Sequence, residues 1–218
     1  MRQIRAIPDL RAFNQFLALA AAHHGQEFNA ATLSRELGIS QPTVKAWAGV
    51  VEASYVGLFL PPWHRNYGKR IVKTPKFYFT DSALVNLLTR QPNAAAALAG
   101  SLGGALLEGW IVAEAAKAYM ARGRKPDIYF WRSHDGLEVD VLLVLDGRLY
   151  PVEAKLTATP SAGHVEPLRR FIRVAGGESA DSGLIVCRTP QARMLPGGHT
   201  ALPWGAFPQW LEERLGAR

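Results

Sequence analysis

Four charged residues form two pairs, each pair two positions apart within an apolar run, in the stretch GLEVDVLLVLDGRLYPVEAK, residues 136–155. Side chains alternate between the two faces of a β-strand, so Glu138 and Asp140 share one face of a first predicted strand. By the same rule Glu153 and Lys155 share one face of a second. Burying unpaired carboxylates is costly, and a cation or a metal ion offsets that cost. The pattern therefore predicts a metal site with a lysine beside it.

The dipeptide Asp146-Gly147 between the two strands suits a two-residue hairpin turn. Carboxylate oxygens are the ligands that Mg²⁺ prefers, and a hard cation supports phosphodiester hydrolysis by polarising the phosphate and acidifying a bound water. In the alternative, Lys155 forms a buried ion pair with Glu153 or Asp140 and there is no catalysis.

A helix is predicted over residues 105–120, and it carries one carboxylate on its apolar stripe. Glu108 shares this stripe with Val112, Ala115 and Tyr119. It is therefore a candidate third acidic residue of the site. A glutamate in the first turn is also favoured by the helix dipole alone, which is the alternative interpretation.

The remaining elements of the second half follow from short apolar runs and turn residues. They are a strand over 127–132, a helix over 165–174, a buried strand over 183–187, and a last short strand and helix near the C-terminus. The predicted order is helix, three strands, helix, strand, then a terminal strand and helix.

The first half predicts a helix-turn-helix. A helix over 13–23 precedes a short one over 29–38 that ends at a glycine, and Ser40 is placed to cap a third helix. Two strands, 55–60 and 76–79, then flank a long loop. This order is typical of a winged helix-turn-helix with a long wing.

The predicted wing is basic and contains no acidic residue. Its cations, together with one on the third helix, are the candidate nucleic-acid contacts: Lys45, Arg65, Lys69, Arg70, Lys73 and Lys76. Two aromatics, Trp63 and Tyr67, stand among them, which suits phosphate contact combined with base stacking. DNA backbone binding is expected, and a solvated basic loop is the alternative.

Composition indicates a globular protein. The 218 residues are 48% hydrophobic and 20% charged with a net charge of +7. Residues 1–90 hold 11 basic against 5 acidic side chains, and residues 91–218 hold 14 against 13.

No apolar run is long enough to span a bilayer, no signal-peptide core is visible, and the single cysteine is Cys187, so a cytoplasmic location without a membrane is expected. The histidines show no zinc-ligand spacing and no G-x-S-x-G motif occurs.

The order of elements and charges resembles the PD-(D/E)xK nuclease superfamily, which has the restriction-endonuclease-like fold. Glu108, Asp140 and the Glu153-Ala154-Lys155 motif carry the resemblance, with Val139 where the name-giving pattern has proline. It implies an αβββαβ domain with a mixed central sheet, in an α+β or α/β protein. Asp140, Glu153 and Glu108 would hold Mg²⁺ or Mn²⁺, and Lys155 would activate the attacking water. The expected domains are 1–90, winged helix, and 91–218, nuclease-like.

Nearly the whole chain is similar to the C-terminal half of prokaryotic AAA-type P-loop ATPases. The segments that carry this similarity are LLEGWIVAE, YFWRSHDGLEVDVLL and YPVEAK. The P-loop motif itself does not occur in the sequence, so an ATPase is expected only as a further module or a partner. The expected function is a Mg²⁺-dependent DNA nuclease. The alternative is a non-catalytic DNA-binding or assembly module that keeps the nuclease fold as scaffold.

Overall fold

The computed structural model of the chain describes residues 9–65 and 73–216. It combines helices with a mixed sheet, which confirms the predicted α+β class. The chain divides into two compact units, Met1–Phe59 with Thr74–Gly109, and Leu60–Lys73 with Trp110–Arg218. Residues 91–109 group with the first unit in this division.

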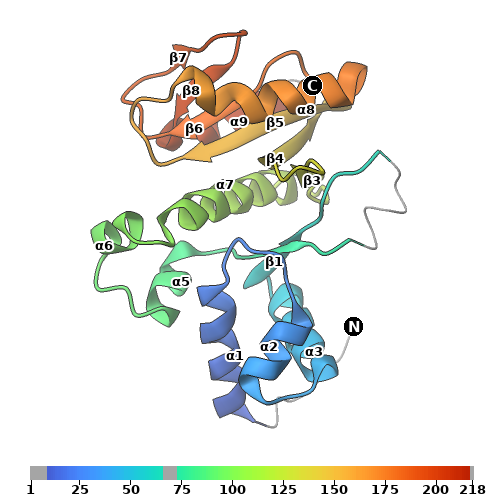
Figure 1. Cartoon of the computed structure of the whole chain (residues 1–218), viewed down its shortest axis with the longest axis vertical. Coiled ribbons are helices and arrows are strands. Elements are labelled where there is room, and N and C mark those ends of the chain that lie inside the picture. The colour runs from blue at the N-terminus through green and yellow to red at the C-terminus, as the bar shows by residue number, and fades with distance from the viewer. Residues whose placement is uncertain (1–8, 66–72, 217–218) are drawn as a thin grey trace. The chain divides into compact units, whose positions relative to one another are not determined.

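The first unit begins with three short helices, of which α1 contacts α2 and α2 contacts α3 (Figure 1). Their bounds are α1 Leu10–Ala22, α2 Ala30–Leu37 and α3 Gln41–Ala53. The Asn29 side chain accepts hydrogen bonds at the start of α2, and Gly38 ends it in the left-handed conformation. Ser40 caps α3 through the Thr43 N–H. The predicted glycine end of α2 and the predicted Ser40 cap of α3 are confirmed, and the winged-helix assignment stays a prediction.

A two-stranded sheet and further helices complete this unit. The elements are β1 Gly57–Leu60, β2 Lys76–Phe79, α5 Ser82–Leu88, α6 Ala94–Ala99 and the start of α7 Gly103–Met120. The core joins the three helices to β2, because Phe16, Trp47, Phe77 and Phe79 all belong to one buried apolar cluster.

The second unit is built on a mixed six-stranded sheet in the order β3-β4-β5-β6-β8-β7. The strands are β3 Ile128–Arg132, β4 Glu138–Leu145, β5 Arg148–Lys155, β6 Leu184–Cys187, β7 Arg193–Met194 and β8 Thr200–Pro203. Neighbouring strands from β3 to β5 are antiparallel, β5, β6 and β8 are parallel, and β7 is antiparallel to β8. The mixed sheet and its predicted strands are confirmed.

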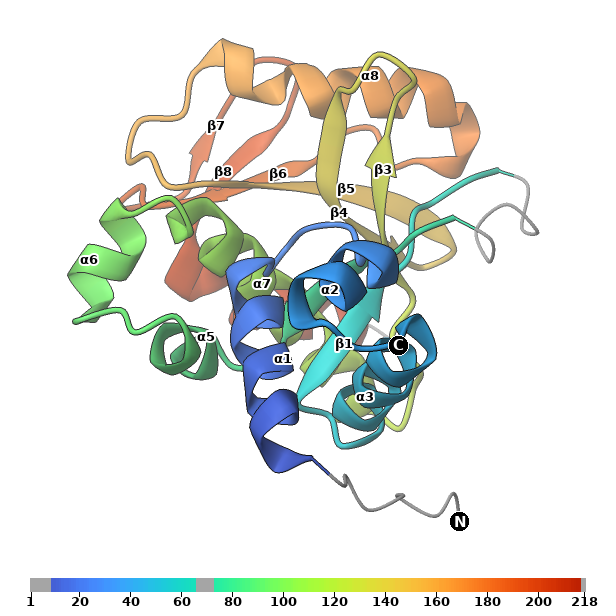
Figure 2. The same ribbon diagram turned by 60° about the horizontal axis from the view of Figure 1, so that its bottom comes forward.

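Helices hold this sheet in place. Helix α8, Glu166–Ala175, packs against β4 and β5 through buried Leu168 and Phe171 (Figure 2). The Tyr119 hydroxyl near the end of α7 donates to the Val144 carbonyl at 2.6 Å. The other helical segments are η1 Ala162–Val165, η2 Gly176–Glu178, η3 Trp204–Ala206 and α9 Phe207–Gly216. Within residues 9–65 and 73–216, no helix has both the length and the apolar character needed to cross a membrane.

Gly109 allows α7 to lie against a buried histidine of the first unit. A Cβ added at Gly109 would stand 2.2 Å from the Nε2 atom of His24, whose ring is packed edge-on against Tyr78. We expect Gly109→Ala to lower the free energy of unfolding by about 1–3 kcal/mol, because the rigid ring must move.

Gly104→Ala is the matched control for Gly109→Ala. It lies on the same helix, and an added Cβ there meets nothing within 4 Å. We expect it to be neutral or to stabilise the chain by up to about 1 kcal/mol. Thermal and urea unfolding of both variants measure the difference, and equal midpoints would contradict the expected clash.

Candidate active site

The β4–β5 hairpin closes with the predicted two-residue turn. Asp146 and Gly147 have φ angles of 50° and 76°, the left-handed values that a twisted hairpin of this kind requires. The register then pairs Leu145 with Arg148 and Val141 with Val152. This register brings the charged positions of the two strands to the open end of the hairpin.

A β-bulge interrupts β4 at its acidic residue. Tyr129 of β3 pairs with Leu142 and Trp131 pairs with Val139, so Asp140 and Val141 together stand opposite one residue of β3. A bulge bends a strand locally and redirects the side chain that it carries, and such bulges are frequent beside active sites. The alternation of side chains along β4 therefore breaks at Asp140.

Asp140 is fixed to the neighbouring strand. Its Oδ2 atom accepts a hydrogen bond of 2.8 Å from the Ala154 N–H. The same oxygen lies 3.9 Å from the Nζ atom of Lys155. The Asp140 carboxylate thus touches both the backbone and the cation of the Glu153-Ala154-Lys155 motif.

Glu153 is the most buried charged group of the hairpin, with a side chain that is 1% exposed. Its Oε2 accepts a hydrogen bond of 2.6 Å from Lys155 Nζ. Its other oxygen, Oε1, accepts no hydrogen bond from any residue that the structure describes. A buried oxygen that accepts no hydrogen bond requires an explanation, and a bound ion is a common explanation.

The electrostatics of Glu153 favour a cation. Burial raises the pKa of Glu153 well above its usual value, and the negative charge of Asp140 raises it further. Lys155 acts in the opposite direction and lowers this pKa through its charge and its hydrogen bond. An added positive charge at this place would favour the ionised carboxylate in the same way.

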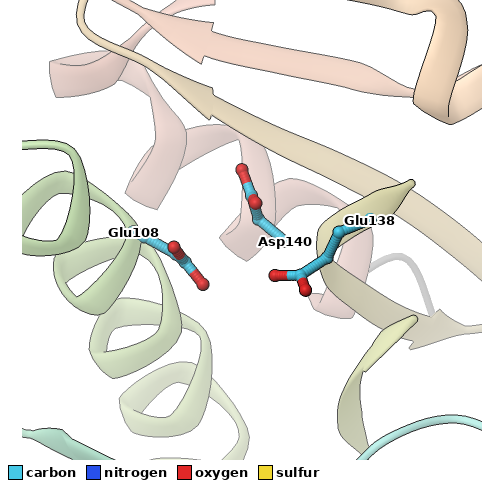
Figure 3. A group of neighbouring side chains, drawn as sticks. All are labelled: Glu108, Glu138 and Asp140. Atoms are coloured by element: carbon cyan, nitrogen blue, oxygen red, sulfur yellow. The ribbon is translucent and has the colours of Figure 1, made fainter. Parts of the chain in front are cut away.

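Glu138 supplies a second carboxylate on β4. One of its oxygens lies within 4.8 Å of one oxygen of Asp140. Arg132 on β3 binds it through Nε at 2.6 Å and through a second guanidinium nitrogen at 2.5 Å. Figure 3 shows Glu138 and Asp140 projecting from β4, and it also labels Glu108 on α7. Arg132 was not singled out from the sequence, although it pairs with Glu138 across the strands.

Glu108 lies in the first unit, where it is partly buried. Its Oε1 atom accepts a hydrogen bond of 2.7 Å from Lys76 Nζ and another from the Tyr78 hydroxyl. The Lys76 side chain is 5% exposed. The structure therefore places Lys76, a candidate phosphate contact in the sequence, in an ion pair inside this unit, and sequence reasoning did not find either partner of Glu108.

The other candidate nucleic-acid contacts do not share one environment. Lys45 on α3 and Lys73 after the long loop are exposed. Arg65 is bound within the second unit, where it pairs with Glu178 at 3.0 Å and donates to the backbone carbonyls of residues 174 and 175. Lys69 and Arg70 lie outside the described residues.

Comparison with known proteins finds two families along the chain. Residues 1–95 match the model of a domain of unknown function, DUF8612, and residues 103–207 match that of another, DUF4143. Uncharacterised proteins of Mycobacterium tuberculosis and Mycobacterium bovis are each 34% identical over 143 residues, which is 66% of this chain and 32% of each relative. The matched part of the chain thus covers about a third of the length of these curated relatives. No solved structure matches.

The raised pKa of Glu153 predicts a pH-dependent stability. Its folded-state pKa exceeds its unfolded-state value, so the stability linked to this group is present at low pH and is lost as pH rises through the folded-state pKa. We expect Glu153→Gln to gain stability over the wild type as pH rises from 5 to 8 without divalent ions. The gain grows by about 1.4 kcal/mol per pH unit between the two pKa values.

Urea unfolding in EDTA at several pH values measures this gain. Glu213→Gln makes the same change on exposed surface of α9 and controls for the substitution itself. A difference between Glu153→Gln and the wild type that is constant from pH 5 to 8 would contradict the raised pKa.

Proposed function

We propose that the β4–β5 hairpin is the metal-dependent active site of a nuclease that hydrolyses phosphodiester bonds in DNA. The observation that carries the proposal is the buried Glu153 carboxylate, whose Oε1 accepts no hydrogen bond among the described residues. Asp140 and Lys155 stand next to it on the same hairpin. This combination matches the acidic residue and the (D/E)xK motif of the PD-(D/E)xK resemblance.

The residues fit a hard divalent cation. Asp140 and Glu153 offer carboxylate oxygens, which suit Mg²⁺ or Mn²⁺, and the hairpin supplies no soft ligand. The Ala154 N–H donates a hydrogen bond to the Asp140 carboxylate. Hydrogen bonds from neighbouring groups commonly orient the side chains that bind a metal ion. Asp140 and Glu153 would hold the ion. When bound, it would act as a Lewis acid and lower the pKa of a coordinated water.

Lys155 has the position required of a charge-stabilising residue. Its Nζ contacts Glu153 Oε2 and lies near Asp140 Oδ2, so the ammonium is held at the two proposed ligands. There it would orient the attacking water and stabilise negative charge that develops on the phosphate oxygens. Glu108 enters the proposal through the family resemblance, as a residue that holds a water or a second ion.

The first unit would position the DNA. We propose that it is a winged helix-turn-helix in which exposed Lys45 contacts phosphates, and that exposed Lys73 of the long loop, which groups with the second unit, contacts them as well. Exposed lysine side chains of this kind favour contact with the DNA phosphate backbone over recognition of individual bases. The relatives are about twice as long as this chain, which leaves room there for the P-loop ATPase module that the second resemblance implies.

A second candidate function is a non-catalytic module that keeps this fold as scaffold. The observation that favours it is the 2.6 Å contact between Lys155 and Glu153, since a buried ion pair can exist without catalysis. The Lys76–Glu108 pair of the first unit is a comparable case. DNA binding without metal-dependent cleavage would support this candidate.

Metal-dependent cleavage tests the proposed nuclease. We expect the chain to cut plasmid or single-stranded DNA with Mg²⁺ or Mn²⁺ and not with EDTA. Asp140→Asn, Glu153→Gln and Lys155→Met should each reduce the rate at least about 100-fold, because each removes a ligand or the stabilising charge. Titration calorimetry with Mn²⁺ should show weaker binding for the two carboxylate variants and retained binding for Lys155→Met.

Glu213→Gln again serves as the control, since it makes an equivalent change on exposed α9. Cleavage that is unchanged in all three hairpin variants would identify a contaminant and overturn the proposal. DNA binding with no cleavage in either metal would favour the scaffold candidate.

DNA binding by the basic wing is tested through its salt dependence. Each phosphate contact contributes about 0.9 to the slope of log affinity against log salt on duplex DNA. We expect Lys73→Ala to make the slope shallower by about 1, and the triple variant at Lys69, Arg70 and Lys73 by up to about 3. Fluorescence anisotropy of a labelled duplex at several salt concentrations measures both.

Lys125→Ala removes one exposed lysine elsewhere, between α7 and β3, and controls for net charge. The same slope in Lys125→Ala and Lys73→Ala would assign the basic loop to ordinary solvated surface.

A further inference from the structure

Three parallel strands of the second unit end in register at one edge of the sheet. Lys155 of β5 pairs with Cys187 of β6, and Cys187 pairs with Pro203 of β8. Because neighbouring strands are about 4.8 Å apart, the backbones of Lys155 and Pro203 lie about 10 Å apart at this edge. The residues that follow these strand ends are therefore near neighbours of the candidate active site.

The first such residue is Arg188, directly after β6. Its side chain is exposed. Its backbone N–H donates to the Thr157 carbonyl at 3.0 Å, which holds the chain that leaves Lys155 beside it. Arg188 thus adds a second cation to the edge at which β5 ends, one strand away from Lys155.

The second is Trp204, directly after β8, whose side chain is 50% exposed. Its ring stands edge-on to the ring of Trp110, with centroids 5.3 Å apart and planes at 76°. Trp110 in turn packs against Phe207, which is fully buried. Trp204 is therefore an indole supported from within the unit and open to solvent on its other side.

We propose that Arg188 and Trp204 form a subsite for single-stranded DNA next to the hairpin. Trp204 stacks on an unpaired base, and Arg188 contacts a phosphate of the same strand. The inference rests on the proposed nuclease function and names its substrate class, a DNA with an unpaired segment such as an overhang or a flap.

Two observations favour a nucleic acid strand over a protein partner as the occupant. The edge combines cations with an open aromatic ring, which is the combination that single-stranded nucleic acids recruit. It is also continuous with Lys155, where the scissile phosphate would lie. Bases inside a duplex are already stacked on both faces, so Trp204 gains a partner only where the strand is unpaired.

Binding in EDTA tests the subsite without cleavage. The full chain is titrated with a fluorescein-labelled 15-nucleotide oligo-dT and with a blunt 15-base-pair duplex. Trp204→Ala should bind the single strand about tenfold more weakly and leave duplex binding unchanged. Trp204→Phe should restore most of the affinity. Met194→Ala removes another exposed apolar side chain of this unit and should have no effect.

Arg188→Gln gives an independent measurement that does not depend on the aromatic ring. It should weaken single-strand binding and make the salt slope shallower by about 0.7, whereas Arg188→Lys should keep the slope. Trp204→Ala should leave the slope unchanged, because stacking releases no counterion.

Each outcome separates this inference from the proposed function. The subsite is overturned if Trp204→Ala binds the single strand within twofold of the wild-type affinity. It is also overturned if Met194→Ala loses as much single-strand affinity as Trp204→Ala. Trp204-dependent binding without metal-dependent cleavage supports the subsite and overturns catalysis. If the chain cleaves single strands and duplex in a metal-dependent way, and Trp204→Ala does not change the rates, the nuclease is supported and the subsite is overturned.

Discussion

The cost of burying the Glu153 carboxylate is the constraint on which the second unit depends. When ionised, this almost fully buried group requires a compensating charge, and Lys155 lies 2.6 Å from it. Asp140 makes the requirement larger, because its negative charge also raises the pKa of Glu153. One ammonium is thus shared between two carboxylates, and one carboxylate oxygen still accepts no hydrogen bond among the described residues.

The sheet holds these charges in place through two kinds of pairing. The tight turn fixes the antiparallel register of β4 and β5, and the bulge at Asp140 lets its carboxylate accept the Ala154 N–H. The parallel pairing of β5 with β6 then brings Arg188 to the edge at which Lys155 ends. The apolar cluster formed with α8 packs against this hairpin and includes Val139 and Leu142 of β4.

Local signals in the sequence were enough to predict most of the helices and strands, although strand β7 was not predicted. Ser40 and Gly38 marked helix ends, Asp146-Gly147 marked the turn, and the alternation of charges marked the hairpin. The bulge was not predicted, because it depends on pairing with β3 rather than on any residue of β4. The ion pair of Lys76 was also missed: the lysine belongs to a basic run in the sequence, but Glu108 and Tyr78 reach it only in the folded chain.

The chemistry of the hairpin is easier to explain by ligand binding than by stability. Replacing a buried ion pair with apolar residues of similar volume is often neutral or stabilising, so a fold gains little from keeping one. Here two carboxylates lie beside one ammonium, next to a bulge and near the end of a strand, so ionising both carboxylates leaves excess negative charge. A purely structural pair would satisfy both oxygens of Glu153, as the hydrogen bonds of a well-packed core do. The remaining oxygen and the excess charge are what a divalent cation would complete, and this favours the metal site over the scaffold.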